Sequence, residues 1–160
     1  MSGQVSASGE AADHDPAGDA ASRRVFVYGT LRRAHPHRMA TFLAAHARHL
    51  GEGTVDGLLV NLGSYPGLSV PGETRVVGDL YEFGAATAED GLAELDAYEG
   101  CSPTDPRPHE YRKATIDVTL AGGEILRSGV YLLNGPPDRF ERIESGDYLA
   151  WLEARGSRRT

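Results

Sequence analysis

The alternation of apolar and polar residues predicts five β-strands along the chain. Runs rich in Val, Leu, Ile, Phe and Tyr occupy residues 25–27, 54–60, 74–83, 111–120 and 125–133. In the fourth run, apolar side chains recur at every second position from Ala114 to Leu120, which is the pattern of a strand with one buried face. The Gly122-Gly123 pair that follows predicts a hairpin with a two-residue connection to the fifth run.

Apolar residues at helical spacing predict a first helix between these strands. It covers residues 39–50 and ends at Gly51, and its apolar stripe has His46 at the edge. The other histidines of this region, His35, His37 and His49, are expected to be exposed. No His-Glu-x-x-His motif, cysteine pair or carboxylate at ligand spacing accompanies them, so no metal site is expected.

Two further helices are predicted in the second half of the chain. Thr87 is a suitable N-cap for a helix over residues 88–98, and Gly100 ends it. Residues 147–152 form a short amphipathic stretch, which Trp151 is expected to dock on the body of the protein. Five or six strands with helices between some of them indicate an α+β fold with a coiled, barrel-like sheet. Glycines within the strand patterns suggest the bulges that such curvature requires.

The domain organisation follows from composition. Residues 1–22 contain mostly Ala, Ser, Gly, Asp and Glu, so they are expected to be a disordered tail before a single domain over residues 23–160. The formal net charge of −7 argues against a nucleic-acid partner, and three arginine pairs are interpreted as solvated surface: Arg23-Arg24, Arg32-Arg33 and Arg158-Arg159. No apolar run approaches membrane-spanning length. The single cysteine, Cys101, is interpreted as a packing residue, and its isolation suits a reducing cytoplasm.

The first predicted strand ends in a glycine turn that is a candidate anion site. Tyr28, Gly29, Thr30 and Leu31 follow the strand directly. Gly29 permits backbone angles and close approaches that a side chain forbids. The backbone N–H groups from Gly29 to Leu31 are then free to face outward, and such a row of donors can hold a carboxylate or a phosphate. An ordinary strand-to-loop turn is the alternative interpretation.

Glu99 is the candidate catalytic residue. On the second helix it falls on the same face as Leu92 and Leu95, so its carboxylate lies on an apolar stripe. Burial and the negative end of the helix dipole both raise the proton affinity of such a group toward that of a general base or acid near neutral pH. The alternative is that the helix frays after Tyr98 and Glu99 turns to solvent. Glu94 and Asp96 lie off the stripe and are interpreted as solvent-facing.

Several segments, taken in order, resemble the gamma-glutamylcyclotransferase-like family, with the gamma-glutamylamine cyclotransferases as the nearest branch. They are Tyr-Gly-Thr-Leu-Arg at 28–32, Tyr-Pro-Gly-Leu at 65–68, Val-Gly-Asp-Leu-Tyr at 77–81, Leu-Asp-Ala-Tyr-Glu-Gly at 95–100 and Tyr-Arg-Lys at 111–113. The resemblance implies a small mixed β-barrel of five to six strands with flanking helices. It also implies an enzyme without a cofactor that acts on a small γ-glutamyl compound.

The resemblance further implies a reaction and the residues that perform it. The α-amine of a γ-glutamyl amine or peptide attacks its own side-chain carbonyl, closing 5-oxoproline and releasing the amine. Glu99 corresponds to the catalytic glutamate, and the backbone from Tyr28 through Gly29 and Thr30 to Leu31 corresponds to the substrate-binding loop. Tyr111 is a further candidate to line the pocket, whereas Tyr65 and Tyr131 are interpreted as packing residues. The proline-rich segment 101–108 departs from a minimal family member and leaves the leaving group open.

Two other functions stay open on sequence alone. A binding module could hold a small carboxylate in the same pocket without turnover, because a fold does not by itself establish an activity. An interaction protein would instead use the tail. The apolar setting of Glu99 favours the enzyme, and the oligomeric state, a homodimer included, stays open.

Overall fold

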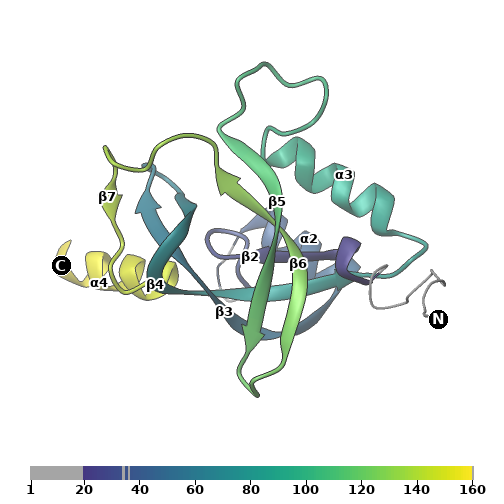
Figure 1. Ribbon diagram of the computed structural model, residues 1–160, viewed down its shortest axis with the longest axis horizontal. Coiled ribbons are helices and arrows are strands. Elements are labelled where there is room, and N and C mark those ends of the chain that lie inside the picture. The colour runs from purple at the N-terminus through teal and green to yellow at the C-terminus, as the bar shows by residue number, and fades with distance from the viewer. Residues whose placement is uncertain (1–19, 34, 36, 160) are drawn as a thin grey trace, which may run out of the picture.

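The computed structural model describes residues 20–33, 35 and 37–159, with side chains described up to residue 156. The strands are β2 (Arg24–Val27), β3 (Ala47–Asn61), β4 (Pro66–Phe83), β5 (Tyr111–Leu120), β6 (Ile125–Leu133) and β7 (Glu141–Arg142). The helices are α2 (Arg38–His46), α3 (Ala88–Tyr98) and α4 (Tyr148–Arg159). In Figure 1, α3 lies beside one end of β5 and β6, and α4 lies at the far side of the molecule near β4 and β7.

Five of these strands close into a mixed β-barrel. The strands follow the order β4-β2-β6-β5-β3, and a long antiparallel pairing of β3 with β4 closes the ring. β2 runs parallel to β6, whereas its pairing with β4 is antiparallel, as are the β5–β6 and β3–β5 pairs. β7 adds a short extension against Val60 and Asn61 at the end of β3. The expected α+β fold with a small mixed barrel is confirmed.

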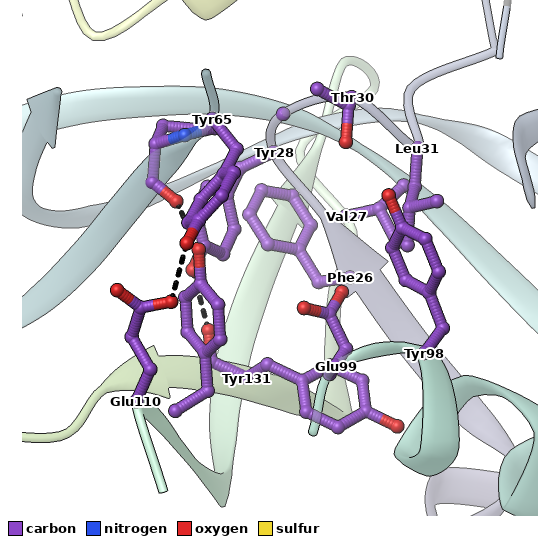
Figure 2. Close-up of a pocket in the computed structure, with 13 residues that line it drawn as sticks. Phe26, Val27, Tyr28, Thr30, Leu31, Tyr65, Tyr98, Glu99, Glu110 and Tyr131 are labelled. Carbon is purple, nitrogen blue, oxygen red and sulfur yellow. Dashed lines mark hydrogen bonds between the residues drawn. The ribbon is translucent and has the colours of Figure 1, made fainter. Parts of the chain in front are cut away.

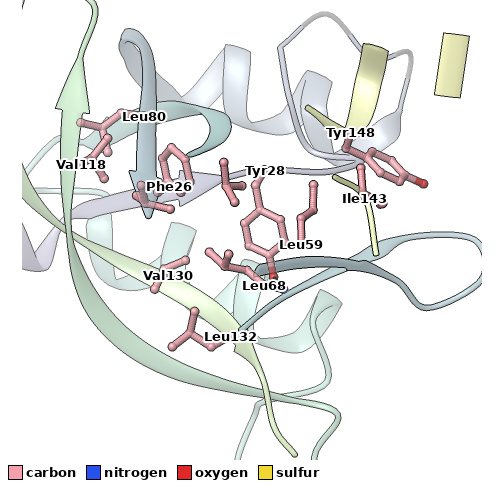
Figure 3. Close-up of a cluster of buried hydrophobic side chains, with 12 residues drawn as sticks. Phe26, Tyr28, Leu59, Leu68, Leu80, Val118, Val130, Leu132, Ile143 and Tyr148 are labelled. Atoms are coloured by element: carbon pink, nitrogen blue, oxygen red, sulfur yellow. Dashed lines mark hydrogen bonds between the residues drawn. The ribbon is translucent and has the colours of Figure 1, made fainter. Parts of the chain in front are cut away.

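β2 separates two cores because its side chains alternate between the faces of the sheet. Phe26 belongs to the cluster inside the barrel, where Leu59, Leu80 and Val130 also lie (Figure 3). Val25 and Val27 point the other way, into a second cluster that contains residues of α2 and α3. The strand is therefore covered on both faces, and its C-terminal end leads directly into the loop that begins at Tyr28.

The long strands β3 and β4 bend at glycines. Their register shifts between His49 and Gly51 and again between Gly57 and Leu58. At Gly57 a Cβ atom would lie 2.7 Å from a methyl group of Leu68, so the two strands approach too closely there for a larger residue. The expectation that glycines mark bulges is confirmed at these positions.

The predicted first helix, 39–50, is too long. α2 ends at His46, and the chain continues directly as β3, in which Ala47 pairs with Phe83 and His49 with Tyr81. Hydrogen bonding to β4 therefore overrides the helical spacing of the apolar residues. His46 is exposed and not at the edge of the core, with Nδ1 2.9 Å from the Phe42 carbonyl oxygen.

Other parts of the prediction can be compared directly with the structure. β5, β6 and the helix over 88–98 have the predicted bounds, but the β5–β6 connection comprises residues 121–124 and not two glycines alone. Trp151 is half-buried on the barrel core, as expected, in an α4 that extends well beyond residue 152.

Residues 1–19 of the expected tail lie outside the described residues, whereas residues 20–22 are helical and Ala20 is buried. No helix in the described part of the chain is long and apolar enough to span a membrane.

Candidate active site

A cavity of about 250 Å³ opens where the end of β2, the end of α3 and the start of β5 meet. All six residues singled out in the sequence line it: Tyr28, Gly29, Thr30, Leu31, Glu99 and Tyr111. Figure 2 shows the Glu99 carboxyl group reaching from the end of α3 toward the middle of this group of residues. The structure thus brings together residues that are up to 83 positions apart in the sequence.

The loop after β2 is anchored at its first residue. The buried Tyr28 hydroxyl donates a hydrogen bond to the carbonyl oxygen of Tyr131 and accepts one from the Leu68 N–H at 3.2 Å. Burial raises the pKa of this hydroxyl above its usual range, so it stays protonated and keeps both bonds. The side chain of Tyr28 therefore holds the end of β2 to β4 and β6.

The backbone N–H groups of the loop are available to a ligand. The structure records no hydrogen bond from the N–H of Gly29, Thr30 or Leu31 to any described residue. All three residues line the cavity. Unpaired donors in succession favour a negatively charged group, because each N–H contributes a partial positive charge.

Gly29 is required by close approach. A Cβ atom at this position would lie 2.5 Å from Cγ and 2.7 Å from Cδ of Pro66. Pro66 opens β4 and is itself buried in the wall of the cavity. Because the proline ring is rigid and the strand behind it is fixed, a side chain at position 29 would push the loop away from the wall.

Arg32 holds the far end of the loop. The sequence analysis interpreted it as a solvated surface residue, and this interpretation is wrong. Only 5% of it is exposed. Its guanidinium contacts three carboxylates: Asp79 at 3.2 Å, Asp147 at 3.1 Å and Glu52 at 2.8 Å. The same Asp79 oxygen accepts a hydrogen bond from the Arg33 N–H at 3.0 Å. Sequence reasoning did not find this group, because its members come from four separate segments.

His49 also belongs to this group of charged residues. It was expected to be exposed but is half-buried. Its Nε2 lies 2.9 Å from Oδ1 of Asp79. Asp79 is itself buried, and it therefore receives hydrogen bonds on both oxygens from residues at the base of the loop. These contacts compensate the cost of burying its carboxylate.

Glu99 occupies a fixed position at the end of α3 and does not fray into solvent. Its N–H donates to the Leu95 carbonyl oxygen at 2.8 Å. Beyond it, the Cys101 N–H bonds to the Asp96 carbonyl and the Gly100 N–H to the Ala97 carbonyl, a Schellman motif with Gly100 at φ 74°. A left-handed residue at position 100 ends the helix immediately after Glu99.

The Glu99 carboxyl group has the properties of a proton-transfer group. Burial, followed by the nearby charge of Glu110, raises the pKa of Glu99 from 4.5 to about 7. The structure records no hydrogen bond or ion pair to this carboxylate from any described residue. A carboxyl group that titrates near neutral pH and has no protein partner can take a proton from a ligand and return it.

Four tyrosines besides Tyr28 line the cavity with Glu99, and sequence reasoning assigned a role there to the side chain of only one of these four. Tyr111, the expected one, donates from its hydroxyl to the Pro66 carbonyl oxygen at 2.6 Å, so its ring faces the cavity. Tyr65 and Tyr131, interpreted as packing residues, also line the cavity, as does Tyr98. The only sequence signal that could have placed Tyr65 and Tyr98 in the cavity is their position in the motifs, where Tyr65 directly precedes Pro66 and Tyr98 directly precedes Glu99.

Two acidic residues near the cavity were misjudged or overlooked in the sequence. Asp96 is half-buried and not simply solvent-facing, since it accepts a hydrogen bond from the Tyr131 hydroxyl at 2.6 Å and pairs with Lys113 at 3.1 Å. Glu110, which was not singled out, lines the cavity and accepts a hydrogen bond from the Tyr65 hydroxyl at 2.7 Å. The cavity thus contains a second carboxylate besides Glu99.

The Cys101 thiol is held by a hydrogen bond and does not line the cavity. The Cys101 thiol donates to the Tyr111 carbonyl oxygen at 3.1 Å, and burial, followed by the charge of Glu99, raises its pKa to about 11. It packs against the outer core, as expected of a small apolar residue. Among the described residues, no three His, Cys, Asp or Glu side chains are grouped in a way that could hold a metal ion.

A comparison with protein families identifies the class of this barrel and cavity. Residues 25–150 match the model of the family described as gamma-glutamyl cyclotransferase, AIG2-like. The match covers the strands of the barrel, α2, α3 and all the cavity residues. The chain therefore belongs to this family of gamma-glutamylcyclotransferase-like enzymes.

Individual relatives agree with this assignment. The chain is 29% identical over 126 residues to the Drosophila melanogaster protein named "Putative gamma-glutamylcyclotransferase CG2811", a match that covers 72% of this chain and 73% of the relative. The crystal structure of an AIG2-like protein of Mus musculus superposes with a TM-score of 0.60 at 28% identity, over 78% of this chain and 88% of that one. The fold alone is shared with Bacillus subtilis YkqA at a TM-score of 0.61 and 24% identity, where 84% of this chain spans only 42% of the other.

Proposed function

We propose that the protein converts a γ-glutamyl amine or γ-glutamyl peptide into 5-oxoproline and the free amine, with Glu99 as general base and then general acid. The observation that carries this proposal is the unpaired carboxyl of Glu99, which shares one cavity with the free N–H groups of Gly29, Thr30 and Leu31. The substrate class follows from the family, and the assignment of roles follows from the chemistry of these groups.

The backbone N–H groups at 29–31 are the proposed anion site. The cavity is lined by no basic side chain among the described residues, so these donors are the groups suited to the α-carboxylate of the substrate. They are equally suited to the oxyanion that develops on the γ-carbonyl oxygen during attack. Arg32 and Asp79 contribute indirectly by fixing the end of the loop.

Glu99 is proposed to move the proton that the reaction requires. An α-ammonium group cannot attack, so the ionised Glu99 carboxylate first removes its proton. The free amine nitrogen then forms a bond to the γ-carbonyl carbon and closes a five-membered ring. When the amide C–N bond breaks, Glu99 delivers that proton to the leaving nitrogen. The ring nitrogen still carries two hydrogens, so Glu99 takes one of them and passes it to the released amine, which departs as an ammonium ion. No water is consumed, and Glu99 ends in the ionised state in which it began.

Proximity supplies much of the acceleration in this scheme. The nucleophile and the carbonyl belong to one molecule, so the enzyme needs only to hold the bent conformer in which they meet. A cavity walled by tyrosines, several of them held by hydrogen bonds, is suited to that task. The single cysteine leaves no intramolecular disulfide to form, which supports a reducing, cytoplasmic setting for the reaction.

The test is to incubate the purified protein with γ-glutamyl alkylamines, γ-glutamyl amino acids and glutathione and to measure 5-oxoproline, free amine and glutamate. We expect 5-oxoproline and free amine in equal amounts from at least one compound. The same compound with an acetylated α-amine should give no product, because its nitrogen can no longer attack. Formation of glutamate instead would indicate hydrolysis, and binding without any product would favour a non-catalytic carboxylate-binding module.

A further inference from the structure

Tyr98 lines the cavity beside Glu99 and has a hydroxyl group to which the proposed reaction assigns no role. In Figure 2 its ring extends past the Glu99 carboxyl group toward Thr30 and Leu31 of the amide loop, the name used here for residues 29–31. Because 39% of Tyr98 is exposed, its hydroxyl group is open to a ligand that enters the cavity.

His37 fixes the position of this hydroxyl group. Its Nε2 lies 2.9 Å from the hydroxyl oxygen of Tyr98, and the two rings meet edge to face with their centroids 5.5 Å apart. The other ring nitrogen, Nδ1, accepts a hydrogen bond from the Met39 N–H at 3.0 Å, so the side chain of His37 is the N-cap of α2. One imidazole ring therefore joins the start of α2 to the end of α3.

This N-cap determines which nitrogen of His37 carries a proton. A ring nitrogen that accepts a hydrogen bond has no proton, so the neutral imidazole carries its proton on Nε2. Burial, followed by the charges of His35 and Arg38, lowers the pKa of His37 and favours this neutral form. The Nε2–H group then donates to the hydroxyl oxygen of Tyr98. The hydroxyl must direct its own hydrogen elsewhere, and the structure records no acceptor for it among the described residues.

A free O–H donor at this position suits an anion that the amide loop holds. The loop offers three N–H groups, from Gly29 to Leu31, whereas a carboxylate has about four lone-pair positions that can accept hydrogen bonds. Three backbone donors therefore leave one position of the carboxylate unfilled. A hydroxyl group that donates to an ionised acceptor forms a stronger bond than one that donates to a neutral oxygen.

We propose that the Tyr98 hydroxyl group is a fourth donor to the α-carboxylate of the γ-glutamyl substrate, and that His37 is the residue that positions it. This inference depends on the proposed function. Tyr98 then binds the substrate without moving a proton, and His37 acts only through Tyr98. The reaction does not alter the α-carboxylate, so the contact is equally strong in the ground state and in the transition state. It should therefore lower KM and leave kcat unchanged.

The test compares Tyr98→Phe and His37→Asn with the wild type, on a γ-glutamyl compound from which the wild type forms 5-oxoproline. Phenylalanine keeps the ring and removes the donor. Asparagine keeps an acceptor for the N-cap, but its side chain is too short to reach Tyr98. We expect each substitution to raise KM by about tenfold, as for the loss of one hydrogen bond to a charged group, and to change kcat by less than about twofold.

The double variant tests whether His37 acts through Tyr98. Both substitutions remove the same contact with the substrate, so Tyr98→Phe combined with His37→Asn should raise KM no further than Tyr98→Phe alone. His46→Asn is the matched control, because His46 is an exposed histidine at the other end of α2 and does not line the cavity. It should keep the wild-type KM. KM does not depend on the amount of folded enzyme, so a partial loss of folded material does not affect these comparisons.

Binding of 5-oxoproline measures the same contact without turnover. Its carboxylate is the α-carboxylate of the substrate, so calorimetric titration should give a Kd that rises in Tyr98→Phe by about the same factor as KM, about tenfold. The amide of 5-oxoproline lacks the negative charge, and its Kd should change less. His46→Asn should bind both compounds as the wild type does.

Each outcome decides the proposal. An unchanged KM in Tyr98→Phe would overturn it, as would a fall in kcat at constant KM, which would place the hydroxyl group on the reacting carbonyl. Additive effects of the two substitutions would overturn the positioning role of His37. In these cases 5-oxoproline still forms and the proposed function stands. If the wild type forms 5-oxoproline from no γ-glutamyl compound, the proposed function fails and this inference fails with it.

Discussion

Nε of Arg32 lies 3.2 Å from Oδ2 of Asp79, and the same oxygen accepts the N–H of Arg33. One buried carboxylate therefore binds both the side chain and the backbone at the point where the amide loop ends. This arrangement links the stability of the barrel to the shape of the candidate anion site, because β4 provides Asp79 and the loop provides the two donors.

Asp79→Asn is expected to lower the free energy of unfolding by about 1.5–3 kcal/mol, because a buried hydrogen bond to a charged group is lost. It should also raise KM for the γ-glutamyl substrate, since the loop loses its anchor. Urea denaturation and steady-state kinetics measure the two effects. Glu52→Gln is the control: it removes a carboxylate that contacts the same guanidinium but is 63% exposed, and it should cost less than about 1 kcal/mol. Equal effects of the two variants would refute the assigned role of Asp79.

Gly29→Ala is expected to destabilise the protein by about 1–3 kcal/mol, because the new methyl group overlaps the Pro66 ring. Displacement of the loop should raise KM as well. Thermal unfolding and substrate titration measure these changes. Gly122→Ala, at a position where a Cβ atom meets nothing within 4 Å, should leave both quantities close to wild type. A wild-type KM in Gly29→Ala would show that the loop does not bind the substrate.

The raised pKa of Glu99 makes stability depend on pH. Its carboxyl titrates near 4.5 when unfolded and near 7 when folded, so between these values the folded state binds more protons. The contribution of this group to stability therefore falls as pH rises from 4.5 to 7. Glu99→Gln lacks the group, so we expect its unfolding free energy relative to wild type to increase over this range and then level off. Urea denaturation from pH 4.5 to 8 tests this, and a difference that is independent of pH would contradict it.

The same pKa predicts the acidic limb of the reaction. Since the base must be ionised, kcat/KM for 5-oxoproline formation should decline below a pKa of about 7. In Glu110→Gln the limb should move to lower pH, because one cause of the raised pKa of Glu99 has been removed. Glu124→Gln, at an exposed position in the turn between β5 and β6, should leave it in place. A limb near pH 4.5 in the wild type would mean that Glu99 is solvated during catalysis.

The sequence predicted the β5–β6 strands and the end of α3 well because local signals decide them. Alternating side chains define the two strands, and Gly100 determines where the helix stops. The candidate base could be located for the same reason, since the spacing of Leu92, Leu95 and Glu99 is a local pattern. The error at residues 47–50 has the opposite cause, because pairing with β4 outweighs the helical periodicity there.

The second carboxylate and the buried arginine could not be predicted in the same way. Arg32 looks like a surface residue until Asp79 and Asp147, which lie 47 and 115 positions away, are brought to it. Glu110 follows an irregular segment without periodicity and acquires its place in the cavity through Tyr65, 45 positions earlier, and through the backbone of Asn134. These contacts depend on the closure of the barrel, which no local pattern describes.

The central claim is that Glu99 moves the proton in a cavity where the loop binds the substrate, and its most direct test is the rate of 5-oxoproline formation by Glu99→Gln. Glutamine preserves the shape of the side chain but cannot accept the proton. The account predicts that kcat falls by about 100-fold or more while KM stays within the same order of magnitude. A variant that forms 5-oxoproline at the wild-type rate would contradict the account.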